Sequence, residues 1–270
     1  HPLGDKDRSF YRELCFGTLR HFFQLNGLLQ PLLKKPFNKK DADIHALLLI
    51  GLYQLQYLRT PDHAAISATV EAANGLKKPW AKGLLNAVLR NFLRQKASSD
   101  QTKALTEAAQ ADHPDWLYNK LKTDWPSAWP DIIDYNNTAP AMALRVNLKR
   151  FSREDYQGQL ALAGIDSEAD ALCQTALRLL SAVNVSALPA FAEGAVSVQD
   201  IGAQLASSLL NAEANMHVLD ACAAPGGKAV NILESAEKVS LTALDSSSER
   251  LLSVEDNLQR CGYHARCIAA

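Results

Sequence analysis

The chain has 270 residues, 47% hydrophobic and 21% charged, a balance typical of a globular protein with two or three domains. No apolar run approaches the ~20 residues of a membrane-spanning helix, and the first residues lack the basic and apolar regions of a signal peptide. The five cysteines are scattered without CxxC spacing, so we expect neither a disulfide framework nor a metal site. These features predict a protein of the reducing cytoplasm.

The net charge of −1 conceals an uneven distribution. Residues 1–100 hold 15 Lys and Arg against 8 Asp and Glu, a balance of +7, whereas residues 101–270 balance at −8. A basic first third indicates contact with a polyanion such as nucleic acid. An ordinary solvated surface of basic helices would give the same count, so charge alone leaves both interpretations open.

Apolar residues at helical spacing predict successive helices in the first third of the chain. The predicted ranges are 7–19, 21–33, 41–57, 63–74 and 80–93. Pro61 separates the third helix from the fourth, and Gly75 provides a left-handed end for the fourth. No strand-like alternation interrupts these helices, so we expect an all-α bundle.

A polar, Ala-rich stretch over residues 95–110 predicts a linker with a short helix, and a further helix begins near Pro114. Three tryptophans follow in the next residues. They are Trp116, Trp125 and Trp129. Large aromatic side chains between domains more often pack than bind ligands, so we expect a packing role for them.

The pattern changes to mixed strands and helices from residue 141. Strands are predicted over residues 142–147, 177–180 and 195–198. Ser152 and Asp155 have the spacing of a capping box at the start of a helix that runs to Gly164. This middle segment predicts a small α+β module.

The last part of the chain alternates strand, helix, strand, helix and strand. The predicted ranges are 216–220, 226–236, 239–245, 247–261 and 264–269. Helical crossovers between strands imply a parallel sheet. Only 42 residues follow Lys228, too few for a whole doubly wound sheet, so we expect the first part of such a core.

The most informative segment is Asp220-Ala221-Cys222-Ala223-Ala224-Pro225-Gly226-Gly227-Lys228, which follows a short apolar strand. Paired glycines let a backbone approach a ligand directly before a helix. A phosphate-binding P-loop is excluded because Cys222 and Ala229 stand where that motif needs glycine and a hydroxyl residue. The dinucleotide fingerprint G-x-G-x-x-G is absent too. A methyltransferase-type loop for S-adenosylmethionine remains.

Asp245 ends the next predicted strand, 18 residues after Gly227, close to the ~20-residue spacing at which an acid binds ribose hydroxyls in this fold. The alternative is that Asp245 caps the following helix, although the serines at 246–248 are expected to provide that cap. Lys228 contacts the cofactor carboxylate or is simply solvated. Asp220 orients the loop through its amides or meets the cofactor, and both alternatives stay open.

The loop resembles motif I of the RNA cytosine-5 methyltransferases, and the whole chain resembles the bacterial small-subunit ribosomal RNA methyltransferase B family, also called Sun or Fmu. The segments that carry the wider resemblance are 7–17, 70–73, 78–90, 188–194 and 198–200. The resemblance covers residues 5–270. Ala229 departs from the family's usual Thr or Ser, which puts one hydrogen bond at the helix start in doubt.

The resemblance implies a multidomain protein with an all-α NusB-like helical bundle, a small α+β connecting module and the first part of an α/β Rossmann-like methyltransferase core. The implied boundaries are 1–135 for the RNA-binding bundle, 136–194 for the module and 195–270 for the partial core. The implied S-adenosylmethionine site consists of Cys222, Ala223, Ala224, Pro225, Gly226, Gly227, Lys228 and Asp245. The partner would be small-subunit ribosomal RNA, and we expect a monomer without membrane or metal.

The resemblance further implies methylation of ring carbon 5 of a cytosine. In that chemistry a thiolate attacks ring carbon 6, and a second cysteine assists release. The family places these cysteines in Pro-Cys-Ser and Thr-Cys-Ser, and neither tripeptide occurs here, so we expect no catalytic residue in this chain and no activity of the chain alone. The alternatives are a non-catalytic RNA-binding or antitermination-type protein with a vestigial cofactor loop, and a methyltransferase for a small molecule or protein.

Overall fold

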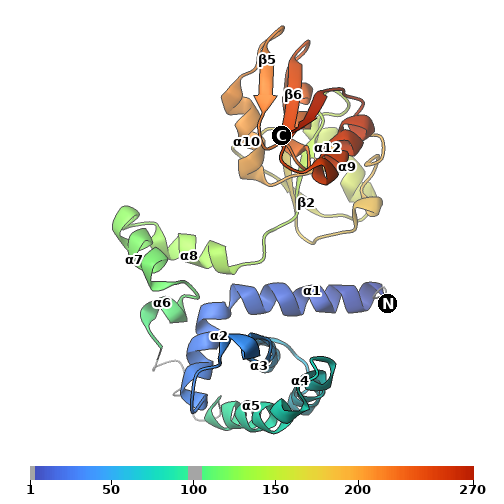
Figure 1. The fold of residues 1–270 in the computed structure, drawn as a ribbon. Coiled ribbons are helices and arrows are strands. Elements are labelled where there is room, and N and C mark those ends of the chain that lie inside the picture. Colours follow the sequence, from blue (N-terminus) through green and yellow to red (C-terminus); the bar gives the residue numbers. More distant parts are fainter. Residues whose placement is uncertain (1–3, 97–104) are drawn as a thin grey trace. The chain divides into compact units, whose positions relative to one another are not determined.

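The computed structural model describes residues 4–96 and 105–270, which divide into two compact units over residues 1–139 and 140–270 (Figure 1). Residues 97–104, which form part of the linker expected over residues 95–110, lie outside the described residues. Each unit has hydrophobic cores of its own. None of the described helices is both long and apolar enough to cross a bilayer.

The first unit is helical, as predicted. Its helices are α1 (Asp5–Arg20), α2 (Phe22–Leu29), α3 (Ala42–Tyr57), α4 (Asp62–Gly75), α5 (Lys82–Lys96), α6 (Glu107–Gln110), α7 (Asp115–Asp124) and α8 (Trp129–Asn137). Short 3₁₀ turns precede α3 and α5 and follow α2; they are η1 (Gln30–Leu32), η2 (Lys39–Asp41) and η3 (Pro79–Ala81). Helix α8 was not predicted from the sequence.

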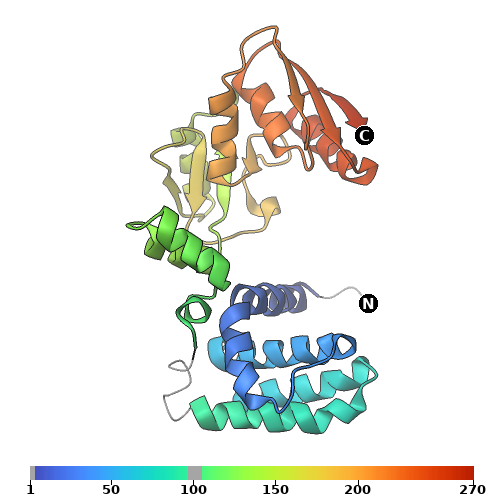
Figure 2. The ribbon, with the colours of Figure 1, turned by 60° about the vertical axis from the view of Figure 1, so that its left-hand side comes forward.

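Helix α3 forms the centre of the bundle and packs against α1, α2, α4 and α5 (Figure 2). It is apolar on most of its circumference, and Ile44, Leu48 and Leu52 are fully buried. A helix that is hydrophobic on every side must be surrounded by other helices. The sequence of α3 therefore dictates the bundle around it.

A smaller core lies between α6, α7 and α8. The rings of Tyr118 and Trp129 meet edge to face with centroids 5.5 Å apart, which confirms the predicted packing role of Trp129. In contrast, Trp116 and Trp125 have exposed side chains and do not take part in this core, so for these two a packing role stays a prediction.

The second unit begins with a four-stranded antiparallel sheet in the order β2-β3-β1-β4. Its strands are β1 (Ala143–Val146), β2 (Ser167–Ala169), β3 (Ala176–Leu179) and β4 (Val196–Val198), with α9 (Arg153–Leu162) between β1 and β2. Ser152 caps α9 as predicted, because its Oγ accepts a 3.0 Å hydrogen bond from the amide of Asp155. Strand β2 was not predicted.

The unit continues with α10 (Ile201–Leu210), another helix that was not predicted, and then with a parallel sheet in the order β5-β6-β7. The alternating elements are β5 (His217–Asp220), α11 (Gly227–Ser235), β6 (Ser240–Asp245), α12 (Ser248–Cys261) and β7 (Arg266–Ala269). The predicted strand-helix alternation and the parallel pairing are both confirmed. Apolar side chains of α11, α12 and β6 form the core beside this sheet.

Candidate functional site

The candidate site lies where the parallel strands β5 and β6 end. Because both strands run in the same direction, Asp220 at the end of β5 and Asp245 at the end of β6 lie at the same edge of the sheet. The loop over residues 221–226 bends over this edge, and the amide of Ala223 donates a 3.0 Å hydrogen bond to the carbonyl of Leu244. In open α/β sheets, ligands bind outside the carboxyl ends of the strands. The fold thus places the glycine loop at that edge.

Gly226 makes the sharp change from loop to helix. Its φ of +103° is a conformation that side chains rarely adopt, and a Cβ atom there would lie 3.1 Å from Cα of Val254 in α12. A Cβ at Gly227 would instead make ordinary contact, 3.6 Å from Nε2 of Gln199. The requirement for glycine at 226 therefore comes from the backbone conformation and from packing against α12, and the sequence alone did not reveal this.

Asp245 has a buried side chain that joins the end of β6 to the loop. Its Oδ2 accepts a 3.1 Å hydrogen bond from the amide of Ala224, and its Oδ1 accepts one of 3.2 Å from the amide of Ser247. A guanidinium nitrogen of Arg250 lies 3.5 Å from Oδ1. These donors, the amide of Ser247 foremost, lower the pKa of Asp245 below its usual range.

Ser247 is the residue that caps α12. Its Oγ accepts a 3.3 Å hydrogen bond from the amide of Arg250, as the sequence predicted for one of these serines. The carboxylate of Asp245 is therefore not the cap of α12. A carboxylate can accept about four hydrogen bonds, so Asp245 can accept a further one besides those from its three donors.

The amino end of α11 has no side-chain cap. Its N-cap residue is Gly226, and the side chain of Lys228 in the first turn is exposed. At Asp220, Oδ1 accepts a 3.4 Å hydrogen bond from the amide of Cys222. The other oxygen, Oδ2, is buried and has no hydrogen-bond partner among the described residues. Free amides at a helix start attract an anion, and an unpaired carboxylate oxygen attracts a donor.

Ala229 occupies the position where the family usually has a hydroxyl residue. Its side chain is fully buried among apolar residues of the parallel-sheet core, with Val230 beside it in the same cluster. The methyl group of Ala229 fits these surroundings, so apolar packing stabilises the first turn of α11 at this position in place of a hydrogen bond from a hydroxyl group.

Arg145 lies behind the loop and was missed in the sequence. This side chain is fully buried in β1, and its Nε donates a 2.7 Å hydrogen bond to Oε2 of Glu234 in α11. Its Nη1 donates to the carbonyl of Gly227 at 2.7 Å and also to Oε1 of Gln199. An arginine between two apolar neighbours in a predicted strand was the signal that could have identified it.

The cysteines differ in exposure. Cys222 in the loop is exposed, while Cys173 and Cys261 are buried. Burial raises the pKa of the thiols of Cys261 and Cys267, which disfavours the reactive thiolate.

Three sequence-family models match successive parts of the chain. The NusB family matches residues 1–94, the ferredoxin-like domain of RsmF/B-like methyltransferases matches 113–186, and the 16S ribosomal RNA methyltransferase RsmB/F family matches 207–270. The chain is 46% identical over 267 residues to ribosomal RNA small subunit methyltransferase B of Serratia proteamaculans. Over nearly all of its length the chain is thus similar to ribosomal RNA small subunit methyltransferase B proteins, and it carries NusB, RsmF/B-like ferredoxin-like and RsmB/F methyltransferase segments.

The similarity to these relatives covers nearly all of this chain but only part of theirs. The Serratia protein is matched over 97% of this chain and 61% of its own length; a relative from Pseudomonas syringae pv. tomato, also 46% identical, is matched over 98% and 59%. The chain thus spans about three fifths of the length of these methyltransferase B relatives.

Solved structures support the fold. The crystal structure of PH0851 has a TM-score of 0.74 at 18% identity, covering 94% of this chain and 59% of that one. A methyltransferase homologue from Pyrococcus horikoshii has a TM-score of 0.52 at 19% identity, covering 60% and 53%. The expected NusB-like bundle, small sheet module and partial methyltransferase fold are confirmed.

Proposed function

We propose that the protein acts in the S-adenosylmethionine-dependent methylation of ring carbon 5 of a cytosine in small-subunit ribosomal RNA, in the cytoplasm. The observation that carries this proposal is the glycine loop at the carboxyl edge of β5 and β6, in a chain similar to proteins of the methyltransferase B family. The family points to methyl transfer and to ribosomal RNA. The site residues point to the cofactor.

The residues of the site fit S-adenosylmethionine. The uncapped amino end of α11 offers amides for the cofactor carboxylate, and the unpaired Oδ2 of Asp220 offers an acceptor for a cofactor donor. Asp245 would accept hydrogen bonds from the ribose hydroxyls. The proposed site comprises Cys222, Ala223, Ala224, Pro225, Gly226, Gly227, Lys228 and Asp245, together with Asp220 at the end of β5. When bound, the cofactor supplies an electrophilic methyl group.

We place the nucleophile outside the five cysteines of this chain. Methylation of ring carbon 5 needs a thiolate to attack ring carbon 6. None of the five stands in a Pro-Cys-Ser or Thr-Cys-Ser tripeptide. In addition, burial raises the pKa of Cys261 and Cys267, and Cys222 lies in the proposed cofactor loop. The chain then binds cofactor and RNA without transferring a methyl group by itself.

The helical bundle, proposed to span residues 1–135, would contact the RNA, with the connecting module over 136–194 and the partial catalytic core over 195–270. The basic residues that we propose for phosphate contact are Lys77, Lys78, Lys82, Arg90 and Arg94. Two of them have acidic partners: Lys78 pairs with Asp41 and Asp43 at 3.0 and 2.8 Å, and Lys82 pairs with Glu71 at 2.9 Å.

A second candidate function is a non-catalytic RNA-binding protein with a vestigial cofactor loop. Ala229, which stands where the family usually has a hydroxyl residue, favours it. The intact glycine at 226 and the hydrogen-bonded Asp245 favour a working cofactor site, because a decayed site has no need of them.

Isothermal titration of the 270-residue chain with S-adenosylmethionine tests the cofactor proposal. We expect saturable binding that is weakened at least tenfold in Asp220→Asn. The substitution removes the negative charge and replaces one of the two carboxylate oxygens by an NH₂ group, which cannot accept a hydrogen bond from the cofactor. A folded chain that takes up no S-adenosylmethionine would contradict the cofactor site and favour the second candidate. Transfer of a radiolabelled methyl group to ribosomal RNA by the chain alone would refute the assignment of the nucleophile.

A further inference from the structure

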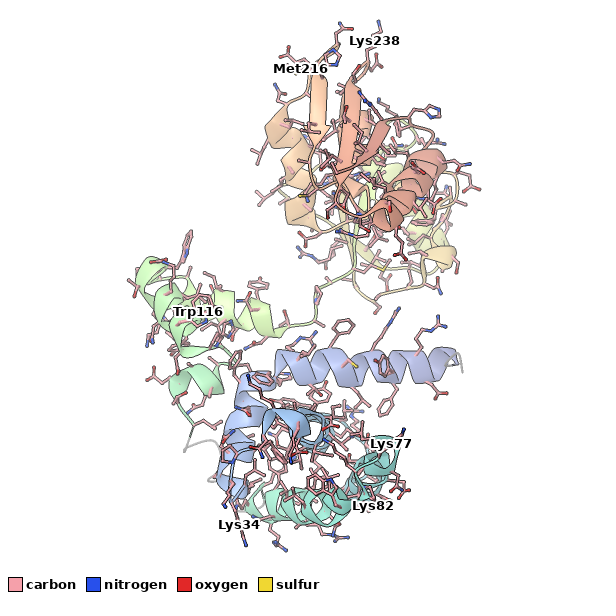
Figure 3. All side chains as sticks on the ribbon, in the orientation of Figure 1. Lys34, Lys77, Lys82, Trp116, Met216 and Lys238 are labelled. Carbon is pink, nitrogen blue, oxygen red and sulfur yellow. The ribbon has the colours of Figure 1, made fainter. Side chains whose placement is uncertain are left out.

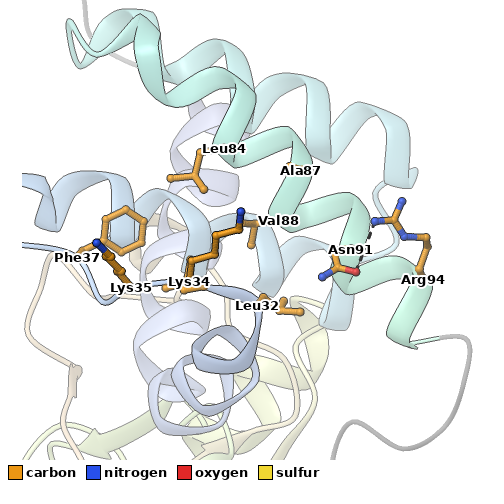
Figure 4. A pocket seen from close by; sticks show the side chains of 10 residues that line it. Leu32, Lys34, Lys35, Phe37, Leu84, Ala87, Val88, Asn91 and Arg94 are labelled. Atoms are coloured by element: carbon orange, nitrogen blue, oxygen red, sulfur yellow. Dashed lines mark hydrogen bonds between the residues drawn. The ribbon is translucent and has the colours of Figure 1, made fainter.

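A groove on the first unit lies between α5 and the segment that follows α2 (Figure 4). Its volume is about 410 Å³, within the range of pockets that hold small ligands. The residues that line it are Leu32, Leu33, Lys34, Lys35, Phe37, Leu84, Ala87, Val88, Asn91 and Arg94. We refer to it below as the basic groove.

The floor of the basic groove is apolar. Leu32, Leu84 and Phe37 are partly buried against the core of the bundle, and Val88 is buried in it. The chain leaves η1 in an extended conformation at Leu33, with φ −100° and ψ 133°, and so runs past α5 and not into another helical turn. The apolar surface of α5 consequently remains accessible beside this segment.

The rim of the basic groove is positively charged. Lys34 and Lys35 lie on the segment after η1, and Arg94 lies on α5 at the other side (Figure 4). No acidic residue lines the groove, and no ion pair is formed by these three cations within residues 4–96 and 105–270. Among the described residues, the side chain of Arg94 has one hydrogen-bond contact, of 3.5 Å to Oδ1 of Asn91.

We propose that the basic groove holds one unstacked nucleotide of single-stranded RNA, with its base on the apolar floor and its flanking phosphates at Lys34, Lys35 and Arg94. This inference rests on the proposed function, in which the first unit meets ribosomal RNA. Sequence-selective proteins read RNA through splayed bases that stack on aromatic and apolar side chains. Cations around the base then bind the phosphates on either side of it.

The amide of Asn91 distinguishes this ligand from a simple polyanion. An Asn side chain carries both a donor and an acceptor, which matches the edge of a base and which an acidic peptide does not require. Figure 3 shows Lys34 at the opposite end of the bundle from Lys77 and Lys82. The basic groove is therefore a different surface from the one that those two lysines form.

The test is a titration of the 270-residue chain with fluorescein-labelled 12-nucleotide oligo(A) and oligo(U) at several salt concentrations. Lys34→Ala/Arg94→Ala should bind about tenfold more weakly, and its salt slope should fall by about 1.4, because each lost phosphate contact on a single strand contributes about 0.7. The control Arg59→Ala/Lys120→Ala removes the same charge elsewhere on the unit and should change binding less than twofold. Equal effects of the two double variants would overturn the proposal.

Asn91→Leu tests the base contact separately from the charge. We expect the difference in affinity between oligo(A) and oligo(U) to shrink while the salt slope is unchanged. A preference identical to that of the unaltered chain would overturn the base-reading role, and displacement of RNA by a 12-residue polyglutamate at equal concentration would assign the groove to acidic peptides. If the unaltered chain binds no RNA, the proposed function fails; if it binds RNA and Lys34→Ala/Arg94→Ala matches its control, only the groove fails.

Crosslinking locates the RNA directly. Irradiation of the complex with a 4-thiouridine-substituted 12-mer should give adducts within residues 32–37 and 84–94. Adducts confined to other peptides would contradict the proposed site. Circular dichroism of each variant verifies its fold, and all the substituted side chains lie at the surface or rim of the unit.

Discussion

The amino ends of α2 and α11 show two treatments of the same physical problem. A helix begins with backbone amides that have no partner within the helix. At α2, the buried Asp112 accepts a 2.9 Å hydrogen bond from the amide of Gln24 and lies 2.6 Å from Nδ1 of His21. At α11, Gly226 supplies no side chain, and the amides stay available.

The amino end of α2 is closed by a side chain of the protein itself, whereas the amino end of α11 is open to a ligand. The carboxylate at α2 is fixed, comes from 88 residues away in the sequence and fastens the segment of α6 and α7 to the bundle. The acceptor that completes α11 would come from a ligand. Other helices, such as α4 and α7, also begin without a side-chain cap. The uncapped end of α11 points to a ligand because it follows the glycine loop and lies near the unpaired Oδ2 of Asp220 at the carboxyl edge of the sheet.

The largest expected effect concerns Arg145, which holds the first residue of α11 in place. Arg145→Met leaves the carboxylate of Glu234 without its cation in a buried surrounding, so we expect the second unit to lose about 3–5 kcal/mol of its free energy of unfolding. Denaturant unfolding followed by far-ultraviolet circular dichroism measures the loss. All four tryptophans, at positions 80, 116, 125 and 129, lie in the first unit, so the tryptophan fluorescence transition should not move.

The double variant Arg145→Met/Glu234→Met is the matched control. Removing both charges leaves no unpaired ion, so most of the lost stability should return. If the double variant is as unstable as the single one, the contact of Arg145 with the carbonyl of Gly227 matters more than the ion pair.

The next largest effect concerns the uncapped end of α11 itself. Gly226→Ala introduces a side chain at φ +103° and 3.1 Å from Cα of Val254, so we expect a loss of roughly 1–3 kcal/mol in the free energy of unfolding of the second unit and weaker cofactor binding. Gly158→Ala in α9 is the control, because a Cβ there meets no atom within 4 Å. That substitution should stabilise the unit by roughly 0.5–1 kcal/mol. Equal effects at both positions would contradict the special role of Gly226.

At α2, replacement of the distant cap should cost less. Asp112→Ala removes the acceptor for the amide of Gln24 and the partner of His21, and a lost cap typically costs about 1–2 kcal/mol. The tryptophan fluorescence transition of the first unit should shift to lower denaturant, whereas Asp134→Ala, an exposed control in α8, should leave it unchanged. A normal transition in Asp112→Ala would show that α2 needs no cap.

The comparison also shows which features could be predicted from the sequence. The caps at Ser152 and Ser247 are local, three residues from the amides they serve, and both were predicted. Asp112 caps α2 through the tertiary fold, so no sequence spacing marks it. Helix α10 does have a local signal, since Asp200 accepts a hydrogen bond from the amide of Ala203, but its small polar residues obscured the apolar pattern.

At the candidate site, the loop and the end of β6 were predictable because a strand, an acid and two glycines are adjacent in the sequence. The role of Arg145 was not, because it depends on a contact between β1 and α11, 82 residues apart at Gly227. Strand β2 has only three residues, too few for a periodic pattern. Long-range contacts and very short elements account for what the sequence did not predict.

The smallest expected effect is a pH dependence at Asp245. Its pKa is lowered in the folded chain by the amides of Ser247 and Ala224 and by Arg250. The carboxylate therefore contributes stability that is fully present above the unfolded-state pKa of about 3.9 and is lost as pH falls through the lower folded-state pKa. Asp245→Asn should reduce the loss of stability of the second unit below about pH 4, measured by urea unfolding at a series of pH values.

Asp256→Asn in α12 provides the baseline for the same titration, since this exposed residue of the second unit has no side-chain hydrogen bond or ion pair within residues 140–270. If Asp245→Asn and Asp256→Asn follow the same pH curve, the donors around Asp245 do not stabilise its charge in solution. A difference confined to the acid range would show that the loop amide of Ala224 and the end of β6 are held together by that charge. Arg145, through the carbonyl of Gly227, and Asp245, through the amide of Ala224, would then both hold the start of α11 in place. The amides of the first turn of α11 would remain available to the ligand.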